Sequence, residues 1–439
     1  MTIFTLLFLY IALLIGVSWW SSRKSSDEDF LIAGRSRGTG AILFSKYASS
    51  VGLGWFMVYT GYIYQFGPSA SLLLPGLVFS FILFAFWAVP RIRASSGTCY
   101  TKGEYVEACT KSTTARHLTD LLSIAIAVLT ILIALIGGAK IISTVGPLSY
   151  EWALLGTAGV VLSYVLLSGF RAVILTDILQ SGIMLVLLIL VAWYAVADST
   201  LTEFASIPSV VNVGELFGFF VFGLLSVFAA SDRYQLTFAA KNNSVAKRGM
   251  FWALAPVLLT FILLMFVGLS VALRISGLDS DLVLLYFIEN SLTVSLLPLA
   301  IVLLCAGLMS TADTYIYVIG LYLARLRSKW RSVFHVRVAI TLVVVILTGI
   351  ALLARNMVDV AILSGALMLP LAIAMIYIIA GGTQAYKFIG AMVGGLIGVV
   401  FGISLLGLSP AAAPFPIIGA LLGLLWPARW TNAPKNTVA

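Results

Sequence analysis

Charge is scarce in this sequence. Asp, Glu, Lys and Arg together supply only 10% of the 439 residues, whereas hydrophobic residues supply 61%. A water-soluble protein of this size could not keep so apolar a surface in water. Apolar runs of about 20 residues, long enough to cross a bilayer, recur along the whole chain. The runs are continuous rather than alternating, unlike those of a membrane β-barrel. The sequence therefore predicts an all-α integral membrane protein.

Cysteine and histidine are almost absent as well. The chain has three cysteines (Cys99, Cys109 and Cys305) and two histidines. None of these residues stands at the spacing of a metal site, and the cysteines give no disulfide framework. No loop between the apolar runs is long enough to fold as a separate soluble domain. This organisation disfavours an enzyme or a receptor.

The distribution of Lys and Arg predicts the orientation in the membrane. With the N-terminus outside, most of the 26 basic residues fall in loops on the cytoplasmic side, which indicates an N-out, C-in topology. The same placement explains the net charge of +9 without any nucleic acid. Thirteen transmembrane helices are predicted, at about residues 2–20, 40–65, 68–90, 117–144, 150–168, 171–198, 212–230, 249–273, 292–325, 334–354, 357–381, 388–407 and 412–427.

One predicted membrane segment carries polar groups at mid-depth. Residues 304–314 read LCAGLMSTADT, with Ser310 and Thr311 about one turn after Gly307. Hydroxyls, together with carbonyls freed by a broken helix, are suitable ligands for Na⁺ near the membrane midplane. Alternatively, the two hydroxyls bond back to their own helix and serve only packing.

A helix break is predicted at a glycine pair in mid-span. In YASSVGLGWF, Gly52 and Gly54 interrupt the second predicted helix, and unwinding there would turn the carbonyls of Ala48 and Val51 inward. Close helix packing through small residues is the alternative explanation. Five segments later, the spacing expected of a five-plus-five inverted repeat, the seventh predicted helix repeats the pattern more weakly at Gly214, Gly218 and Gly223.

Asp177 and Lys46 are ionisable residues that lie well inside predicted helices. Asp177 is about six residues into its helix, or about 9 Å deep, and Lys46 lies at a similar depth. Buried ionisable groups usually mark ion pathways in membrane proteins. A structural ion pair between Lys46 and Asp177 is the alternative.

Four stretches resemble the sodium:solute symporters, the family of sodium/galactose, proline, pantothenate and sialic-acid carriers. AGLMSTADT resembles the eighth core helix of that family, and SGFRAVILTDILQ resembles its signature of Gly, Ala-Val, Thr-Asp and Gln. DFLIAGRS and QLTFAAKNNSVAKRG resemble two of its loops. These stretches lie at residues 306–314, 168–180, 29–36 and 235–249.

The resemblance implies a LeuT-type fold and a sodium site. The fold would comprise an extra N-terminal helix and loop (1–39), two inverted repeats (40–198 and 212–381) and two additional helices (388–427). The implied sodium ligands are the carbonyls of Ala48, Val51 and Gly307 and the hydroxyls of Ser310 and Thr311. In some members an aspartate at the position of Asp177 lies on the sodium exit path or helps to form a second sodium site.

The implied function is secondary active transport: Na⁺-coupled symport of a small organic solute, an amino acid or a small carboxylate, by alternating access. The expected location is the plasma membrane, as a multi-pass protein of a bacterial inner membrane. Expected partners are the solute, the sodium ion and the lipid bilayer; the oligomeric state is left open. No arginine is predicted at midplane to clamp a carboxylate. Candidate lining residues, each of which could instead serve packing, are Ser50, Trp55, Phe56, Tyr59, Phe219 and Phe222.

Two departures from the family leave alternatives open. Gln235 and Leu236 stand where the family usually has Gln-Arg. Lys46 places a cation about one turn from the proposed carbonyl ligands, where it would repel sodium unless Asp177 neutralises it. A proton-coupled or uncoupled carrier using Lys46 and Asp177 is therefore an alternative. A symporter-like membrane sensor is another, although no kinase domain follows the last apolar segment.

Overall fold

The computed structural model describes residues 3–22, 32–95, 97, 99–197, 212–293, 295–326 and 333–426. These residues form helices and connecting turns, and one isolated bridge joins Arg37 to Ala240. The longer helices are α1 (Ile3–Ser22), α3 (Thr39–Ser50), α4 (Leu53–Phe66), α5 (Leu73–Leu83), α8 (Thr113–Val145), α9 (Tyr150–Ala197), α11 (Val213–Ala229), α14 (Leu254–Arg274), α16 (Leu297–Leu326), α17 (Val333–Leu353), α18 (Met357–Ile379), α19 (Ala385–Leu406) and α20 (Pro414–Leu424).

Shorter helices complete the chain. Four that the sequence analysis did not separate or predict are α7 (Lys102–Thr110), α12 (Ser231–Ala239), α13 (Asn243–Trp252) and α15 (Val283–Ser291). A continuous helical stretch after α5 passes through the π-helix η3 (Phe84–Ala88) into α6 (Val89–Ser95), and the 3₁₀ segments are η1 (Ala33–Arg35), η2 (Gly67–Leu72), η4 (Ser280–Leu282) and η5 (Pro410–Ala412).

Among the described residues, eight helical stretches are long and apolar enough to cross a membrane, or nine if α11 and α12 together form one bent span. The prediction of an all-helical membrane protein is confirmed, but the described residues contain eight or nine candidate membrane spans and not the thirteen predicted. The segments predicted at 150–168 and 171–198 are continuous in α9, and only Val173–Val191 of this helix meets the requirement. The apolar stretches Thr5–Trp20 and Pro410–Leu424 are shorter.

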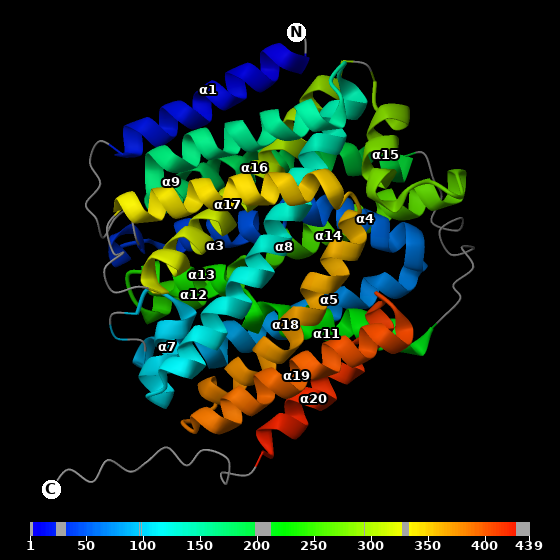
Figure 1. Cartoon of the computed structure of the whole chain (residues 1–439). Helices are drawn as coiled ribbons and strands as arrows, with labels where there is room; N and C mark the ends of the chain where they lie inside the picture. Colours follow the sequence, from blue (N-terminus) through cyan, green and yellow to red (C-terminus); the bar gives the residue numbers. More distant parts are fainter. Residues whose placement is uncertain are drawn as a thin grey trace, which may run out of the picture.

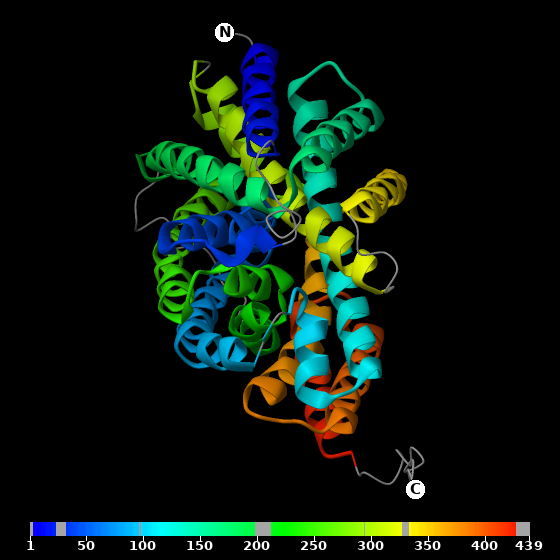
Figure 2. The same ribbon diagram turned by 90° about the vertical axis from the view of Figure 1, so that its left-hand side faces the viewer.

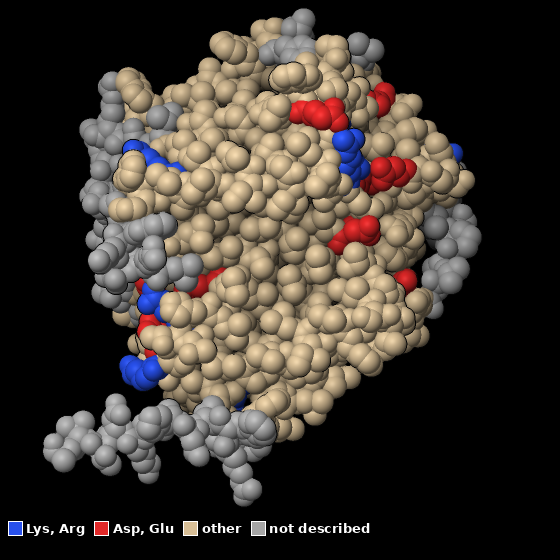
Figure 3. All heavy atoms as spheres, in the orientation of Figure 1, with Lys and Arg blue, Asp and Glu red and all other residues tan. Residues whose placement is uncertain are grey.

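The surface fits this interpretation. Figure 3 shows charged side chains gathered near opposite edges of one face, with a broad band between them that is almost free of charge. Large apolar side chains are exposed to the surroundings, among them Trp193, Val345 and Phe401. Such a surface is suited to lipid chains rather than water. The N-out, C-in orientation stays a prediction, and several basic residues behind it, including Lys24, Arg327 and Arg429, lie outside the described residues.

The helices surround two broken ones. Figures 1 and 2 place α1 at one edge of the molecule and the α19–α20 pair at the opposite edge, with the other helices between them. The break between α3 and α4 packs on α16, and α11 packs on α5 and α18. The central helix α16 is buried on nearly all sides from Ala300 to Tyr322. Polar side chains on a helix so enclosed must find partners inside the protein.

The second break lies later than predicted. The chain leaves the helix at Ala230, which has an extended backbone, and α12 then continues at an angle of 41° to α11. The glycines that suggested a break further upstream serve close packing instead. A Cβ on Gly223 would lie 2.2 Å from the carbonyl oxygen of Leu73, and one on Gly218 would lie 2.0 Å from that of Pro410.

Candidate functional site

The first broken helix positions the candidate ion site. The helix predicted at 40–65 is interrupted as expected: α3 ends at Ser50, Val51 and Gly52 lie outside the helix, and α4 begins at Leu53. Gly54 belongs to the first turn of α4. Past the break, Trp55 donates to the carbonyl of Gly52 rather than to that of Val51, so the regular hydrogen-bonding pattern of the helix is interrupted there.

This break lies directly against α16. A Cβ on Gly52 would lie 1.3 Å from Oγ1 of Thr311 and 2.9 Å from the carbonyl oxygen of Gly307, so only glycine allows this approach. Thr311 donates a weak hydrogen bond of 3.2 Å to that same carbonyl. The break therefore contacts the turn of α16 that carries the predicted ligands Gly307, Ser310 and Thr311. Val51, another predicted ligand, is adjacent to Gly52 at this break.

A buried carboxylate lies beside this contact. Asp177 on α9 accepts hydrogen bonds from Ser310 of α16 at 2.7 Å and from Ser45 of α3 at 2.6 Å. Its side chain is fully buried. One turn along α16, Asp313 accepts a long bond of 3.4 Å from Thr176. Hydroxyls and carboxylates from three helices therefore meet at one level, and hard cations favour such oxygen ligands.

Lys46 does not pair with Asp177. Its Nζ lies 3.1 Å from Oδ2 of Asp232, the second residue of α12, and it also donates to Ser49 and Ser50. Ser49 donates to the same carboxylate at 2.8 Å, and the neighbouring Arg233 donates to its other oxygen at 2.9 Å. All of these side chains are buried. Two cations thus share one carboxylate where the two broken helices meet.

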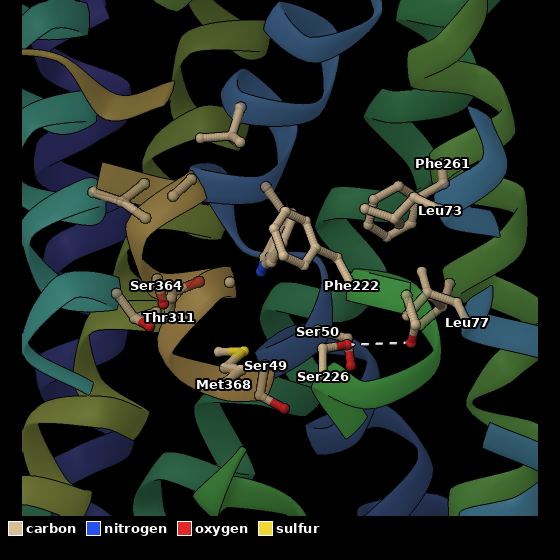
Figure 4. A pocket seen from close by; sticks show the side chains of 18 of the residues that line it. Ser49, Ser50, Leu73, Leu77, Phe222, Ser226, Phe261, Thr311, Ser364 and Met368 are labelled. Carbon is tan, nitrogen blue, oxygen red and sulfur yellow. Dashed lines mark hydrogen bonds between the residues drawn. The ribbon is translucent and has the colours of Figure 1, made fainter. Parts of the chain in front are cut away.

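A cavity opens beside this cluster. It lies between the broken helices, α5, α14, α16 and α18. Its volume is about 60 Å³. Figure 4 shows Thr311 and Ser364 on one side and Phe261, Leu73 and Leu77 on the other. Because Thr311 lines this cavity and also touches Gly52, the candidate ion site and the cavity adjoin.

The predicted lining residues divide into two groups. Ser50, Trp55 and Phe222 line the cavity. The other three do not. Tyr59 packs edge-on against Phe261 with ring centroids 4.7 Å apart, Phe219 packs against Tyr62 at 5.2 Å, and Phe56 is buried among apolar side chains.

Comparison with known proteins now bears on this geometry. The model of the sodium:solute symporter family matches residues 30–214. The resemblance to the sodium:solute symporters is confirmed. That family consists of transporters, and the match covers somewhat less than half of the chain. A comparison with curated proteins gives no match.

Solved structures share the fold of this chain. A Na⁺-coupled sialic acid symporter in a substrate-bound, outward-open state matches with a TM-score of 0.80 at 14% identity, over 97% of this chain and 97% of that one. Mhp1, a nucleobase-cation-symport-1 family transporter, in a closed conformation with bromovinylhydantoin bound, gives 0.65 at 14% identity over 90% and 92%. A mutant manganese transporter of Eremococcus coleocola gives 0.54 at 17% identity over 89% and 93%. These likenesses show a LeuT-type helical fold.

The sequence analysis missed two candidate functional residues. Asp232 was not singled out, and Arg233 was assigned to a cytoplasmic loop; in the structure both are buried, and Arg233 lines the cavity. The signal was available, since an Asp-Arg pair directly follows an apolar run. A short buried helix such as α12 can hold such a pair inside the protein, whereas the count of basic residues treats it as a loop.

Proposed function

We propose that the protein couples the entry of Na⁺ to the uptake of a small organic solute, an amino acid or a small carboxylate, by alternating access. The observation that carries this proposal is the contact of the α3–α4 break with α16, where Gly52 lies on Thr311 and Gly307. The contact gathers backbone carbonyls and side-chain hydroxyls in a buried place where the regular helical hydrogen-bonding pattern is interrupted. In transporters, ions are held at such interruptions of membrane helices.

The sodium ligands in this proposal are the carbonyls of Ala48, Val51 and Gly307 and the hydroxyls of Ser310 and Thr311. Asp177, bonded to Ser310, is the next acceptor for an ion that leaves the site, or a ligand of a second ion. Sodium, rather than the ammonium of Lys46, is the proposed occupant, because this ammonium is paired with Asp232. Asp177 accepts from Ser45 and Ser310 and not from Lys46, so it is left to the ion.

The transport cycle follows from the elements that the ion touches. Sodium would hold the α3–α4 break against α16 and so favour the outward-open state. The solute would then enter the adjoining cavity and allow the outer side to close. Loss of the ion toward Asp177 would release the two elements from each other. Coupling requires only that ion and solute favour the same state.

We also propose the finer architecture. The two broken helices, α3–α4 and α11–α12, each open one half of a five-plus-five repeat, with repeats at 40–198 and 212–381. The segments 1–39 and 388–427 flank them, in keeping with the positions of α1 and α19–α20 at opposite edges (Figure 1). In a bacterial plasma membrane this protein would lie with its N-terminus outside and its C-terminus inside.

The test removes both hydroxyl ligands. The double variant Ser310→Ala, Thr311→Ala should lose the thermal stabilisation that NaCl gives relative to KCl at equal ionic strength, and its sodium-stimulated uptake in proteoliposomes should be abolished. Thr348→Ala is the matched control, since this hydroxyl on α17 only bonds back to its own helix. A sodium response in the double variant equal to that of the wild type would remove the ion-site assignment.

The same preparation tests the alternatives. Uptake driven by an imposed pH gradient without Na⁺ would indicate a proton-coupled carrier that uses Lys46 and Asp177. Ion and solute binding without accumulation against a gradient would indicate a sensor.

A further inference from the structure

On the basis of the proposed function, we infer that the solute is an organic monoanion with an apolar body, and that Arg233 binds its carboxylate. Arg233 is the charged residue among the described residues that line the cavity. Only 7% of its surface is exposed, and its Nε has no hydrogen-bond partner in the described structure. A buried guanidinium with an unused donor, facing a cavity, is a binding group for an anion.

Asp232 holds the guanidinium of Arg233 in position. One Nη donates to Asp232 at 2.9 Å, which fixes the side chain against α12. A guanidinium has five N–H donors in a planar fork, so donors are left for a second carboxylate. The hydroxyls of Ser49 and Ser50, on the same wall of the cavity, add polar groups next to the guanidinium.

Charge balance favours an anion over a zwitterion. Lys46 and Arg233 share Asp232, which gives two positive charges and one negative charge in a buried cluster. No carboxylate is found on the described wall of the cavity. The ammonium of an amino acid would therefore meet no counter-charge there, and burying an unpaired charge is costly. A monoanion meets the excess positive charge instead.

The remaining wall fits an apolar body. Aromatic rings and aliphatic side chains cover it, among them Trp55, Phe81, Phe222, Phe261 and Leu73. With about 60 Å³ open in this state, the body must be small or the cavity must widen to take it. Hydrophobic walls with a single polar anchor are typical of sites for small amphipathic ligands.

Sodium and the anion would stabilise each other. An added Na⁺ brings a further positive charge into this buried region, and a monoanion in the adjoining cavity offsets it. The solute should therefore bind more tightly with Na⁺ present, and Na⁺ more tightly with the solute present. This reciprocity is what a symporter requires.

The experiment compares ligands that differ only in charge. The purified full-length protein is heated in NaCl or in KCl with 3-phenylpropanoate, phenylalanine or 3-phenylpropanamide, and with straight-chain monocarboxylates from acetate to hexanoate next to their amides. We expect stabilisation by one or more carboxylates in NaCl, and none by the matching amide or by phenylalanine. Stabilisation by amides or by the amino acid, with no carboxylate effective, would overturn the inference.

Variants locate the binding group. Arg233→Gln should weaken carboxylate binding by about tenfold to a hundredfold, as expected for the loss of a charged hydrogen bond, and Arg233→Lys should keep part of it. The exposed Arg248 supplies the control Arg248→Gln. Retention of the sodium response by Arg233→Gln shows that its fold is intact. Wild-type carboxylate affinity in Arg233→Gln would remove Arg233 from the site.

The two proposals fail separately. If carboxylates stabilise the wild type equally in NaCl and KCl, and sodium itself has no effect, sodium coupling fails while the anion site stands. If sodium stabilises the protein and only neutral or zwitterionic solutes bind, the anion site fails while sodium coupling stands.

Discussion

The contact of Gly52 with α16 makes Gly52→Ala the most direct test of the ion site. Gly52 has φ −63° and ψ 169°, a backbone that alanine adopts without strain. The effect of the substitution is therefore purely steric. The new methyl group would lie 1.3 Å from Oγ1 of Thr311, whereas ordinary contact begins at 3.4 Å. The broken helix must move by about 2.1 Å, the difference of these two distances, or the Thr311 hydroxyl must rotate away.

Either response would weaken the proposed sodium site. Overpacking of a buried contact costs about 1–3 kcal/mol. In the proposed mechanism sodium draws the break and α16 together, so most of this cost would fall on the ion-bound state. With tenfold in affinity for each ~1.4 kcal/mol, the apparent affinity for Na⁺ should fall by about fivefold to more than a hundredfold.

The assay is a sodium titration of thermal stability, with KCl keeping the ionic strength constant. Gly40→Ala is the matched control, because Gly40 lies in the first turn of the preceding helix α3, is exposed, and has no atom within 4 Å of the added Cβ. The control should leave the sodium midpoint unchanged.

A second variant separates steric damage from misfolding. Gly52→Ala with Thr311→Ala removes the 1.3 Å contact and leaves two closer than 3.0 Å, with Cβ of residue 311 at 2.7 Å and with the carbonyl oxygen of Gly307 at 2.9 Å. Stability without sodium should therefore recover only in part, while the sodium response stays absent. A Gly52→Ala protein with the wild-type sodium midpoint would refute the placement of the ion between the break and α16.

Two further predictions concern buried charges. Asp232→Asn should lower the free energy of unfolding by about 3–5 kcal/mol, because it leaves two buried cations without a carboxylate. Lys46→Met should cost less, because it leaves Asp232 paired with Arg233. Equal losses in thermal unfolding would contradict this shared pairing. Asp281→Ala should cost about 3 kcal/mol, since the carboxylate accepts from Lys140 and from the backbone of Met357 and Val358 at the start of α18. Asp279→Ala, whose half-exposed side chain makes the longer contact with Lys140, should cost less than about 1 kcal/mol, and a reversed order would refute the role of Asp281.

The sequence predicted the first helix break because its signal is local. Two glycines in an apolar run of YASSVGLGWF leave little to pack, and the backbone opens at Gly52. The same signal failed in the seventh predicted helix. Gly218 and Gly223 sit where another backbone approaches, a role that depends on Pro410 and Leu73 far away in the sequence. A glycine in a membrane helix has both uses, and only the tertiary partner decides between them.

The charged cluster was missed for a related reason. Lys46 and Asp232 are separated by 186 positions, and no local pattern joins them. Asp177 was the partner considered, since it lies at a similar depth, yet depth alone does not fix which face of a helix a residue occupies. The bend after Ala230 was not predicted either, so α12 was treated as part of a cytoplasmic loop although every residue of it is buried.

In the proposed mechanism, α3 contacts both the ion site and the solute site. Ser45 on this helix bonds Asp177 on the ion side, and Lys46 bonds Asp232 on the cavity side. Because successive residues on one helical turn hold the two carboxylates, α3 cannot shift toward one without changing its bond to the other. A sodium ion that competes with Ser45 for Asp177 would therefore alter the cluster that orients Arg233. The coupling needs no long pathway, since one turn of helix connects the two sites.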